Sequence, residues 1–286
     1  MKRTGKGILD IIWYIIVFAL LQYVCLVLTA TVSMAAGGKS ASQIAHAVLN
    51  GSLGLGSTLI IVATILSSLL TLVLFVWRGW APISRTYLRS KPWAVFAWVT
   101  ILAVGTIIPS EFLVEQVDIQ LPEPTQQLFE GILSEPLGYV AVGIFAPLVE
   151  ELVFRGAILR TLLRFFSSRM HWLPIIISAL IFGALHINWA QFIHAFLIGL
   201  LLGWMYYRTN SILPGVLFHW VNNTMAFVLY HLTPSMADGK LIDLFNGSQR
   251  TVWLSLFFSF CLIIPAIYQL ALRMRRSGSG HEIINN

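Results

Sequence analysis

The chain has 286 residues, of which 57% are hydrophobic and only 10% are charged. Soluble domains carry about 25% charged residues, so this composition excludes an ordinary soluble protein and predicts an all-α, polytopic membrane helix bundle. The net charge of +6 does not indicate a nucleic-acid partner, because the basic residues lie at the ends of apolar segments. Basic residues at such ends orient a membrane protein and meet anionic lipid.

The apolar segments predict about eight transmembrane helices, since a helix that crosses a bilayer needs about 20 apolar residues. The first segment has a basic start like a secretory signal, but its apolar run is longer than a signal core of roughly 7–15 residues. We therefore expect a retained membrane anchor. The predicted spans are residues 8–32, 55–77, 93–110, 138–160, 174–188, 190–207, 212–232 and 252–272.

The distribution of basic residues predicts the orientation of these spans. Fifteen of the 18 Lys and Arg residues lie on one side of an eight-span arrangement, and the other side holds Lys39, Lys240 and Arg250. Cytoplasmic loops carry an excess of Lys and Arg, so both termini are predicted to be cytoplasmic. The outer loop 111–135 has six acidic residues and no basic ones, and we expect either a solvated face or an acidic lid.

Two adjacent glutamates interrupt the fourth span. Ionisable groups at bilayer depth are costly and usually face a bundle interior or a water-filled cavity. Glu151 and Arg155 have the i, i+4 spacing in the favoured acid-before-base order, which predicts an ion pair. Because adjacent helical residues point about 100° apart, Glu150 then faces elsewhere, and we predict a cavity where it can act as a general base. The alternative is that both glutamates simply pair with Arg155 and other helices.

Histidines in two further spans complete the candidate site. His186 ends the fifth span, and His219 lies in the seventh with Asn223 four residues later on the same helix face. His194 is expected to be a packing residue and Asn222 an interhelical contact. The zinc motif HExxH, the nucleophile motif GxSxG and the P-loop are all missing from the sequence, which leaves Glu, His and Asn chemistry.

These residues carry a resemblance to a known family. EELVFR at 150–155, FGALH at 182–186 and HWVNN at 219–223 match, in order, its EExxxR, FxxxH and HxxxN motifs. The family is the CPBP family, which comprises intramembrane CAAX prenyl proteases and bacteriocin-processing enzymes. The resemblance covers roughly residues 138–225, with Asn210 where Gly is common, and the eight predicted spans are similar to the family's eight-helix core. We treat residues 1–286 as one integral-membrane domain, with the catalytic core spans in 138–232 and a polar cytoplasmic tail in 273–286.

The resemblance implies an intramembrane endopeptidase in which Glu150 activates water. The family is usually classed with the metalloproteases, and two histidines with a carboxylate can hold Zn²⁺ with an open position, so His186 and His219 are candidate metal ligands. Equally, Glu150 can activate water directly while His and Asn groups stabilise the oxyanion. The implied catalytic residues, with Arg155 as a supporting residue, are Glu150, Glu151, His186, His219 and Asn223.

The implied partners are membrane lipid and a peptide or protein substrate, either a prenylated CAAX-type substrate or a bacteriocin-related one, in a bacterial plasma membrane. Two alternatives stay open. One is a proton-coupled transporter that uses the buried Glu and His residues as a relay, although such proteins often show two related halves and no internal repeat is visible in the sequence. The other is a non-catalytic membrane scaffold or immunity protein.

Overall fold

The computed structural model describes residues 2–82, 86–117, 123–186, 188–232 and 240–274. All regular structure in these ranges is helical, which confirms the all-α prediction. Five helical segments within them are long and apolar enough to cross a membrane: Gly5–Ala36, Ser57–Trp77, Trp93–Gln116, Pro136–Leu162 and Gln249–Arg273. The polar tail beyond residue 274 lies outside the described residues.

Each of the eight predicted spans corresponds to a helical segment, and shorter helices lie between them. The fourth span is a composite of α-helical and wider π-helical turns. In chain order the elements are α1 Lys2–Ala36, α2 Ala41–Leu49, α3 Ser57–Trp77, α4 Thr86–Arg89, α5 Trp93–Gln116, α6 Glu123–Ser134, α7 Pro136–Gly138, η1 Tyr139–Phe145, α8 Ala146–Glu150, η2 Glu151–Leu159, α9 Arg160–Leu162, η3 Ser168–Met170, α10 Trp172–Ala184, α11 Trp189–Thr209, α12 Leu213–Leu232, α13 Leu241–Leu244 and α14 Gln249–Arg273.

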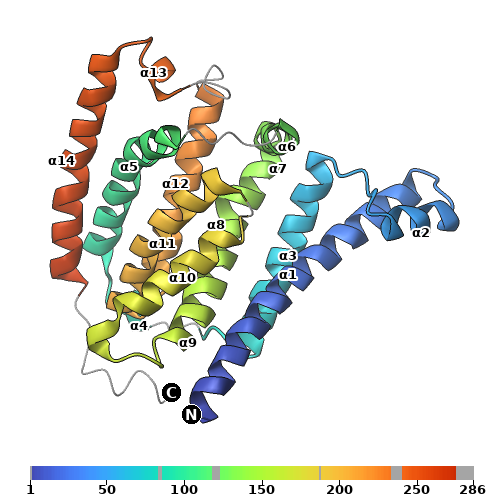
Figure 1. Ribbon diagram of the computed structural model, residues 1–286, viewed down its shortest axis with the longest axis horizontal. Helices are drawn as coiled ribbons and strands as arrows, with labels where there is room; N and C mark the ends of the chain where they lie inside the picture. Colours follow the sequence, from blue (N-terminus) through green and yellow to red (C-terminus); the bar gives the residue numbers. More distant parts are fainter. Residues whose placement is uncertain (1, 83–85, 118–122, 187, 233–239, 275–286) are drawn as a thin grey trace.

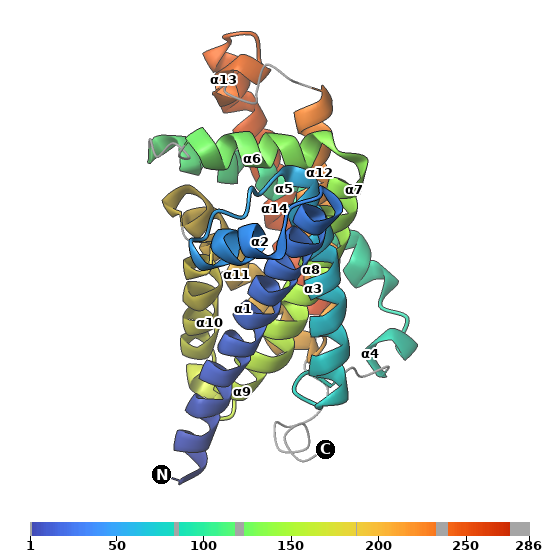
Figure 2. The same ribbon diagram turned by 90° about the vertical axis from the view of Figure 1, so that its right-hand side faces the viewer.

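The long helices stand side by side in an antiparallel bundle. Helix α1 packs along α3, α5 along α14, and α10 along α11. The start of α1 and the end of α14 lie at the same end of the bundle (Figure 1), while α6 lies across the opposite end (Figure 2). Helix α1 diverges from α10 toward that opposite end (Figure 1), so the N-terminal helices form one flank of the bundle interior.

The described parts of the acidic segment 111–135 are mostly helical, whereas a loop was predicted. Helix α5 continues through Glu111 to Gln116, and α6 occupies Glu123–Ser134. The extension is explained by packing, because Phe112 contacts the Trp253 ring with centroids 5.7 Å apart. In α6 the buried Ile132 packs against α3, so apolar residues interspersed with the acidic ones hold both helices in place.

Local chemistry accounts for the ends and close contacts of the helices that carry the site. Gly199 and Gly203 let α11 approach α10, since a Cβ at these positions would lie 3.0 Å from Ala179 Cβ and 2.8 Å from Ile175 Cγ2. Asn210 ends α11 in the left-handed conformation, with φ 50°. Asn tolerates this conformation better than most residues, so the helix can end here without a glycine.

Candidate active site

The predicted ion pair between Glu151 and Arg155 is present. Arg155 Nη1 donates to Glu151 Oε1 at 2.7 Å, and the two side chains are 1% and 0% exposed. The guanidinium also lies 4.4 Å from the centre of the Phe182 ring, an arrangement that favours a cation–π contact. Because each charge has its counter-charge beside it, the pair can lie inside an apolar bundle.

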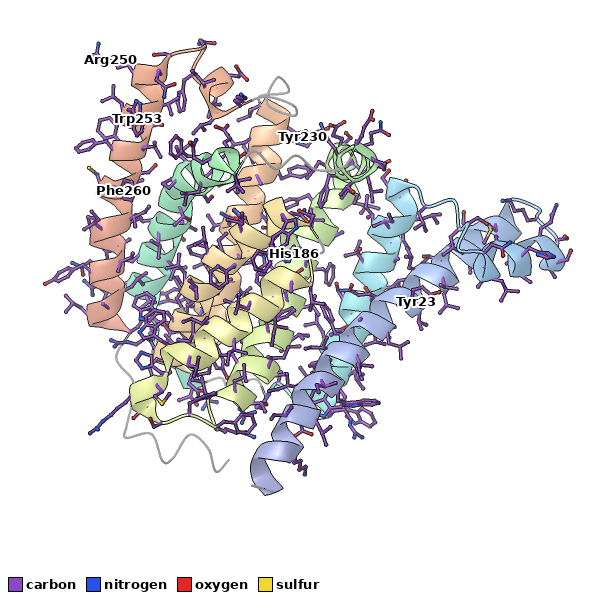
Figure 3. All side chains as sticks on the ribbon, in the orientation of Figure 1. Tyr23, His186, Tyr230, Arg250, Trp253 and Phe260 are labelled. Atoms are coloured by element: carbon purple, nitrogen blue, oxygen red, sulfur yellow. The ribbon has the colours of Figure 1, made fainter. Side chains whose placement is uncertain are left out.

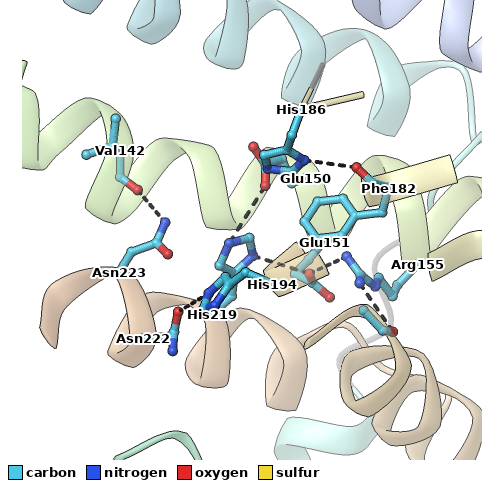
Figure 4. A network of polar contacts seen from close by, with 11 residues as sticks. Val142, Glu150, Glu151, Arg155, Phe182, His186, His194, His219, Asn222 and Asn223 are labelled. Atoms are coloured by element: carbon cyan, nitrogen blue, oxygen red, sulfur yellow. Dashed lines mark hydrogen bonds and ion pairs between the residues drawn. The ribbon is translucent and has the colours of Figure 1, made fainter. Parts of the chain in front are cut away.

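His219 lies between the two adjacent carboxylates. Its Nδ1 is 3.5 Å from Glu151 Oε1, and its Nε2 is 3.7 Å from Glu150 Oε2. Figure 4 shows the resulting series of contacts from Arg155 through Glu151 and His219 to Glu150. Residues on α8, η2 and α12 therefore form one polar network. Glu150 and His219 lie far apart in the sequence, and the fold brings them together.

The remaining glutamate, Glu150, faces a cavity as predicted. A cavity of about 480 Å³ lies between the N-terminal helices and the α8–α10 region, and Glu150 and His186 both line it. The Glu150 side chain is 22% exposed, against 0% for Glu151. The two neighbouring glutamates therefore differ in surroundings: Glu151 is held by Arg155, whereas Glu150 is accessible from the cavity.

His186 lies just beyond the end of its helix rather than within it. Helix α10 ends at Ala184, and the His186 ring nitrogen Nδ1 is 3.0 Å from the carbonyl oxygen of Phe182. The last carbonyls of a helix have no partner within the helix, so Nδ1–H donates to this one. In the neutral ring Nε2 then keeps its lone pair. Figure 3 shows His186 near the middle of the bundle, and Figure 4 shows it beside Glu150.

Asn223 is placed by a contact with the backbone of η1. Its Nδ2 donates to the Val142 carbonyl oxygen at 2.8 Å. A π-helical turn pairs residues five apart, and such turns are frequent at functional sites. Asn223 thus connects α12 to the element that leads into Glu150, one helical turn from His219, and its amide keeps a second N–H.

The histidines and carboxylates of the site are the side chains that could hold a metal ion. Within the described ranges, no group of three or more His, Cys, Asp or Glu side chains is arranged to hold a metal ion. His219 faces the two carboxylates directly, and His186 reaches the site from the cavity side (Figure 4). Because no third protein ligand is grouped with them in the described ranges, the metal-ligand role of His186 and His219 stays a prediction.

Two further residues contact the site, and neither was predicted to belong to it. His194 on α11, predicted to be a packing residue, has its Nε2 3.3 Å from Asn222 Oδ1 on α12. Figure 4 shows His194 beside His219. Gly215 lies one turn before His219, where a Cβ would come within 2.5 Å of Glu151 Oε2. Gly215 precedes His219 by four residues, but its contact with Glu151 depends on the fold.

The fold and the site together define a helical integral-membrane protein with a buried network of carboxylates and histidines. Residues 132–225 match the model of a family described as Rce1-like, type II CAAX prenyl endopeptidase. The match confirms the predicted resemblance over this segment. Comparisons with curated proteins and with solved structures gave no match.

Proposed function

We propose that the protein is an intramembrane endopeptidase in which Glu150 activates the water that attacks the scissile carbonyl. The observation that carries this proposal is the contrast between the two glutamates. Glu151 is buried in an ion pair with Arg155, whereas Glu150 faces a cavity that His186 also lines. The family match over residues 132–225 supports the same class of reaction.

The proposed reaction needs only water and the side chains of the site. Glu150 accepts a proton from water as the oxygen attacks the carbonyl carbon, and a tetrahedral intermediate forms. The intermediate then breaks its C–N bond, and Glu150 returns the proton to the leaving amine. The products are a new carboxyl group and a new amino group, so atoms and protons balance.

The remaining polar groups are proposed to orient the base and stabilise charge. His219 faces Glu150 with one nitrogen and Glu151 with the other, so a doubly protonated ring can donate to both carboxylates. We assign the developing oxyanion to the second N–H of Asn223 and to the Nε2–H of His219, which turns from Glu150 to the oxyanion after Glu150 has accepted the proton, in line with the family motif. His186 Nε2, whose ring is fixed through Phe182, is assigned to orienting the water by accepting a hydrogen bond.

We further propose that α10, α11 and α12 also cross the membrane, which gives eight spans with both termini cytoplasmic. The excess of Lys and Arg at one side supports this orientation, in a bacterial plasma membrane. The proposed substrate is a membrane-associated peptide or protein, with a prenylated CAAX-type C-terminus or a bacteriocin-related sequence. A prenyl chain suits the apolar side chains of the cavity, which include Phe18, Leu26 and Ile60.

The experiment is a cleavage assay with the purified full-length protein in liposomes. The panel contains prenylated CAAX peptides, the same peptides without the prenyl group, and apolar membrane peptides, with products identified by mass spectrometry. A chelator arm with Zn²⁺ add-back tests the metal. Cleavage of any panel member supports the proposal, whereas proton flux without cleavage supports the transporter alternative and contradicts it.

A further inference from the structure

The family-matched segment builds only one side of the cavity. Glu150, Phe154 and His186 belong to it, but the opposite side comes from α1 and α3, which precede residue 132. Helix α1 contributes Gln22 and α3 contributes Thr64, among mainly apolar neighbours. Whatever occupies the cavity beside Glu150 therefore also contacts two helices that the family motifs do not cover.

Gln22 is a polar side chain in an otherwise apolar part of α1. The surrounding span, Gly5–Ala36, has a mean hydropathy of 2.5 in its most apolar window. The Gln22 amide lines the cavity and makes no hydrogen bond with any residue in the described part of the chain. The Gln22 side chain is exposed, so its donor and acceptor are accessible to a ligand in the cavity.

A contact between aromatic rings fixes the height of Gln22 relative to Glu150. Phe18 meets Phe154 edge to face, with ring centroids 6.1 Å apart. Gln22 lies four residues after Phe18, and Glu150 lies four residues before Phe154. Because α1 and the Pro136–Leu162 segment run in opposite directions (Figure 1), both steps lead the same way along the bundle. Gln22 and Glu150 therefore lie at similar heights on facing sides of the cavity.

We propose that Gln22 hydrogen-bonds the backbone of the substrate next to the peptide bond that Glu150 hydrolyses, which makes Gln22 a substrate-positioning residue. This inference rests on the proposed function. A peptide must be extended for its scissile bond to be reached, and its N–H and C=O groups then need partners in place of water. The Gln amide offers both a donor and an acceptor, which matches one peptide unit. The ligand class is thus an extended peptide segment.

The test measures binding separately from cleavage. A dye-labelled prenylated CAAX peptide is titrated against full-length protein in liposomes, in a Glu150→Gln background that prevents turnover. Gln22→Leu should weaken binding about fivefold, the loss expected for one hydrogen bond. Thr29→Val is the matched control, since Thr29 Oγ1 bonds the backbone of its own helix at Cys25 and Leu26; this control should bind as tightly as the background.

A modified ligand identifies the bond itself. Peptides in which successive backbone amides are replaced by esters lose one N–H donor each. One of these esters should weaken binding with Gln22 present and have no further effect with Gln22→Leu. Equal binding of Gln22→Leu and its background would overturn the inference, and so would equal ester effects in both. Gln22→Met is the second variant if the leucine variant does not fold.

Parallel cleavage assays with Glu150 intact distinguish a failure of the proposed role of Gln22 from a failure of the endopeptidase proposal. Normal cleavage and normal KM in Gln22→Leu would overturn the role of Gln22 and leave the endopeptidase proposal standing. Binding that depends on Gln22, without cleavage by the wild type, would overturn the endopeptidase proposal and leave the peptide contact standing. Absence of peptide binding to the background protein would overturn the inference about Gln22.

Discussion

Arg155 and Glu151 form a salt bridge of 2.7 Å between side chains that are 1% and 0% exposed. Both residues lie on η2 and are four residues apart. Their side chains are the most deeply buried part of the polar network. This pair fixes the rotation of the helix that carries Glu150. The stability of the fold should therefore depend on Arg155 and Glu151, whereas the rate of cleavage should depend on Glu150.

Replacing Arg155 with Ala should destabilise the protein strongly, because it leaves Glu151 buried without its counter-charge. The expected loss is about 3–5 kcal/mol, seen as a lower yield of folded protein and a lower Tm. Arg169→Ala, which removes an exposed basic residue of η3, is the control and should behave like the wild type. A variant at Arg155 with normal Tm and normal activity would show that the salt bridge has no structural role.

Gly215→Ala should be harmful although alanine favours helices. The added Cβ would lie 2.5 Å from Glu151 Oε2, and the carboxylate is held by Arg155, so the helices must shift. Overpacking of this kind costs about 1–3 kcal/mol, and it should also lower activity by moving His219. Gly5→Ala, whose Cβ meets nothing within 4 Å, should leave Tm and activity unchanged. Equal Tm values for the two variants would refute the close approach.

If His219 and Glu150 work together in catalysis, the losses of kcat caused by replacing each of them should not add. If Glu150 and His219 act as one unit, each single substitution should abolish most of the activity, and the double variant should lose little more. The measurement is kcat for Glu150→Gln, His219→Ala and the double variant on one peptide. Losses that multiply in the double variant would mean that the two side chains act independently.

His194 and Asn222 should show an energetic coupling across α11 and α12. Removing a buried hydrogen bond costs about 1 kcal/mol, and a double-mutant cycle of His194→Ala and Asn222→Ala isolates this contribution. The Tm of each single variant should fall, and the double variant should fall less than the sum. His46→Ala on the exposed part of α2 serves as the control. Additive losses would contradict the contact.

The part of the site that depends on local spacing was predictable from the sequence. The ion pair of Glu151 and Arg155 follows from i, i+4 geometry, and the orientation of Glu150 away from it follows from the helical repeat. The helical class and the positions of the long helices follow from the apolar runs, because a bilayer demands a minimum length.

The part that depends on tertiary packing was not predictable. The position of His186 beyond the end of α10 depends on where the helix stops, which the apolar pattern left open. His194 joins the network only because α11 packs against α12, and Gln22 faces Glu150 only because Phe18 meets Phe154. Contacts between residues far apart in sequence leave no periodic signal in a single chain.

The most direct test of the central claim compares Glu150→Gln with the wild type in liposomes on one cleaved peptide. The substitution keeps the size of the side chain and removes its ability to accept the proton from water. We predict a fall in kcat of about a thousandfold or more, on the order of the contribution of a general base, with an unchanged Tm. Cleavage by Glu150→Gln within tenfold of the wild-type rate would contradict the assignment of Glu150 as the base.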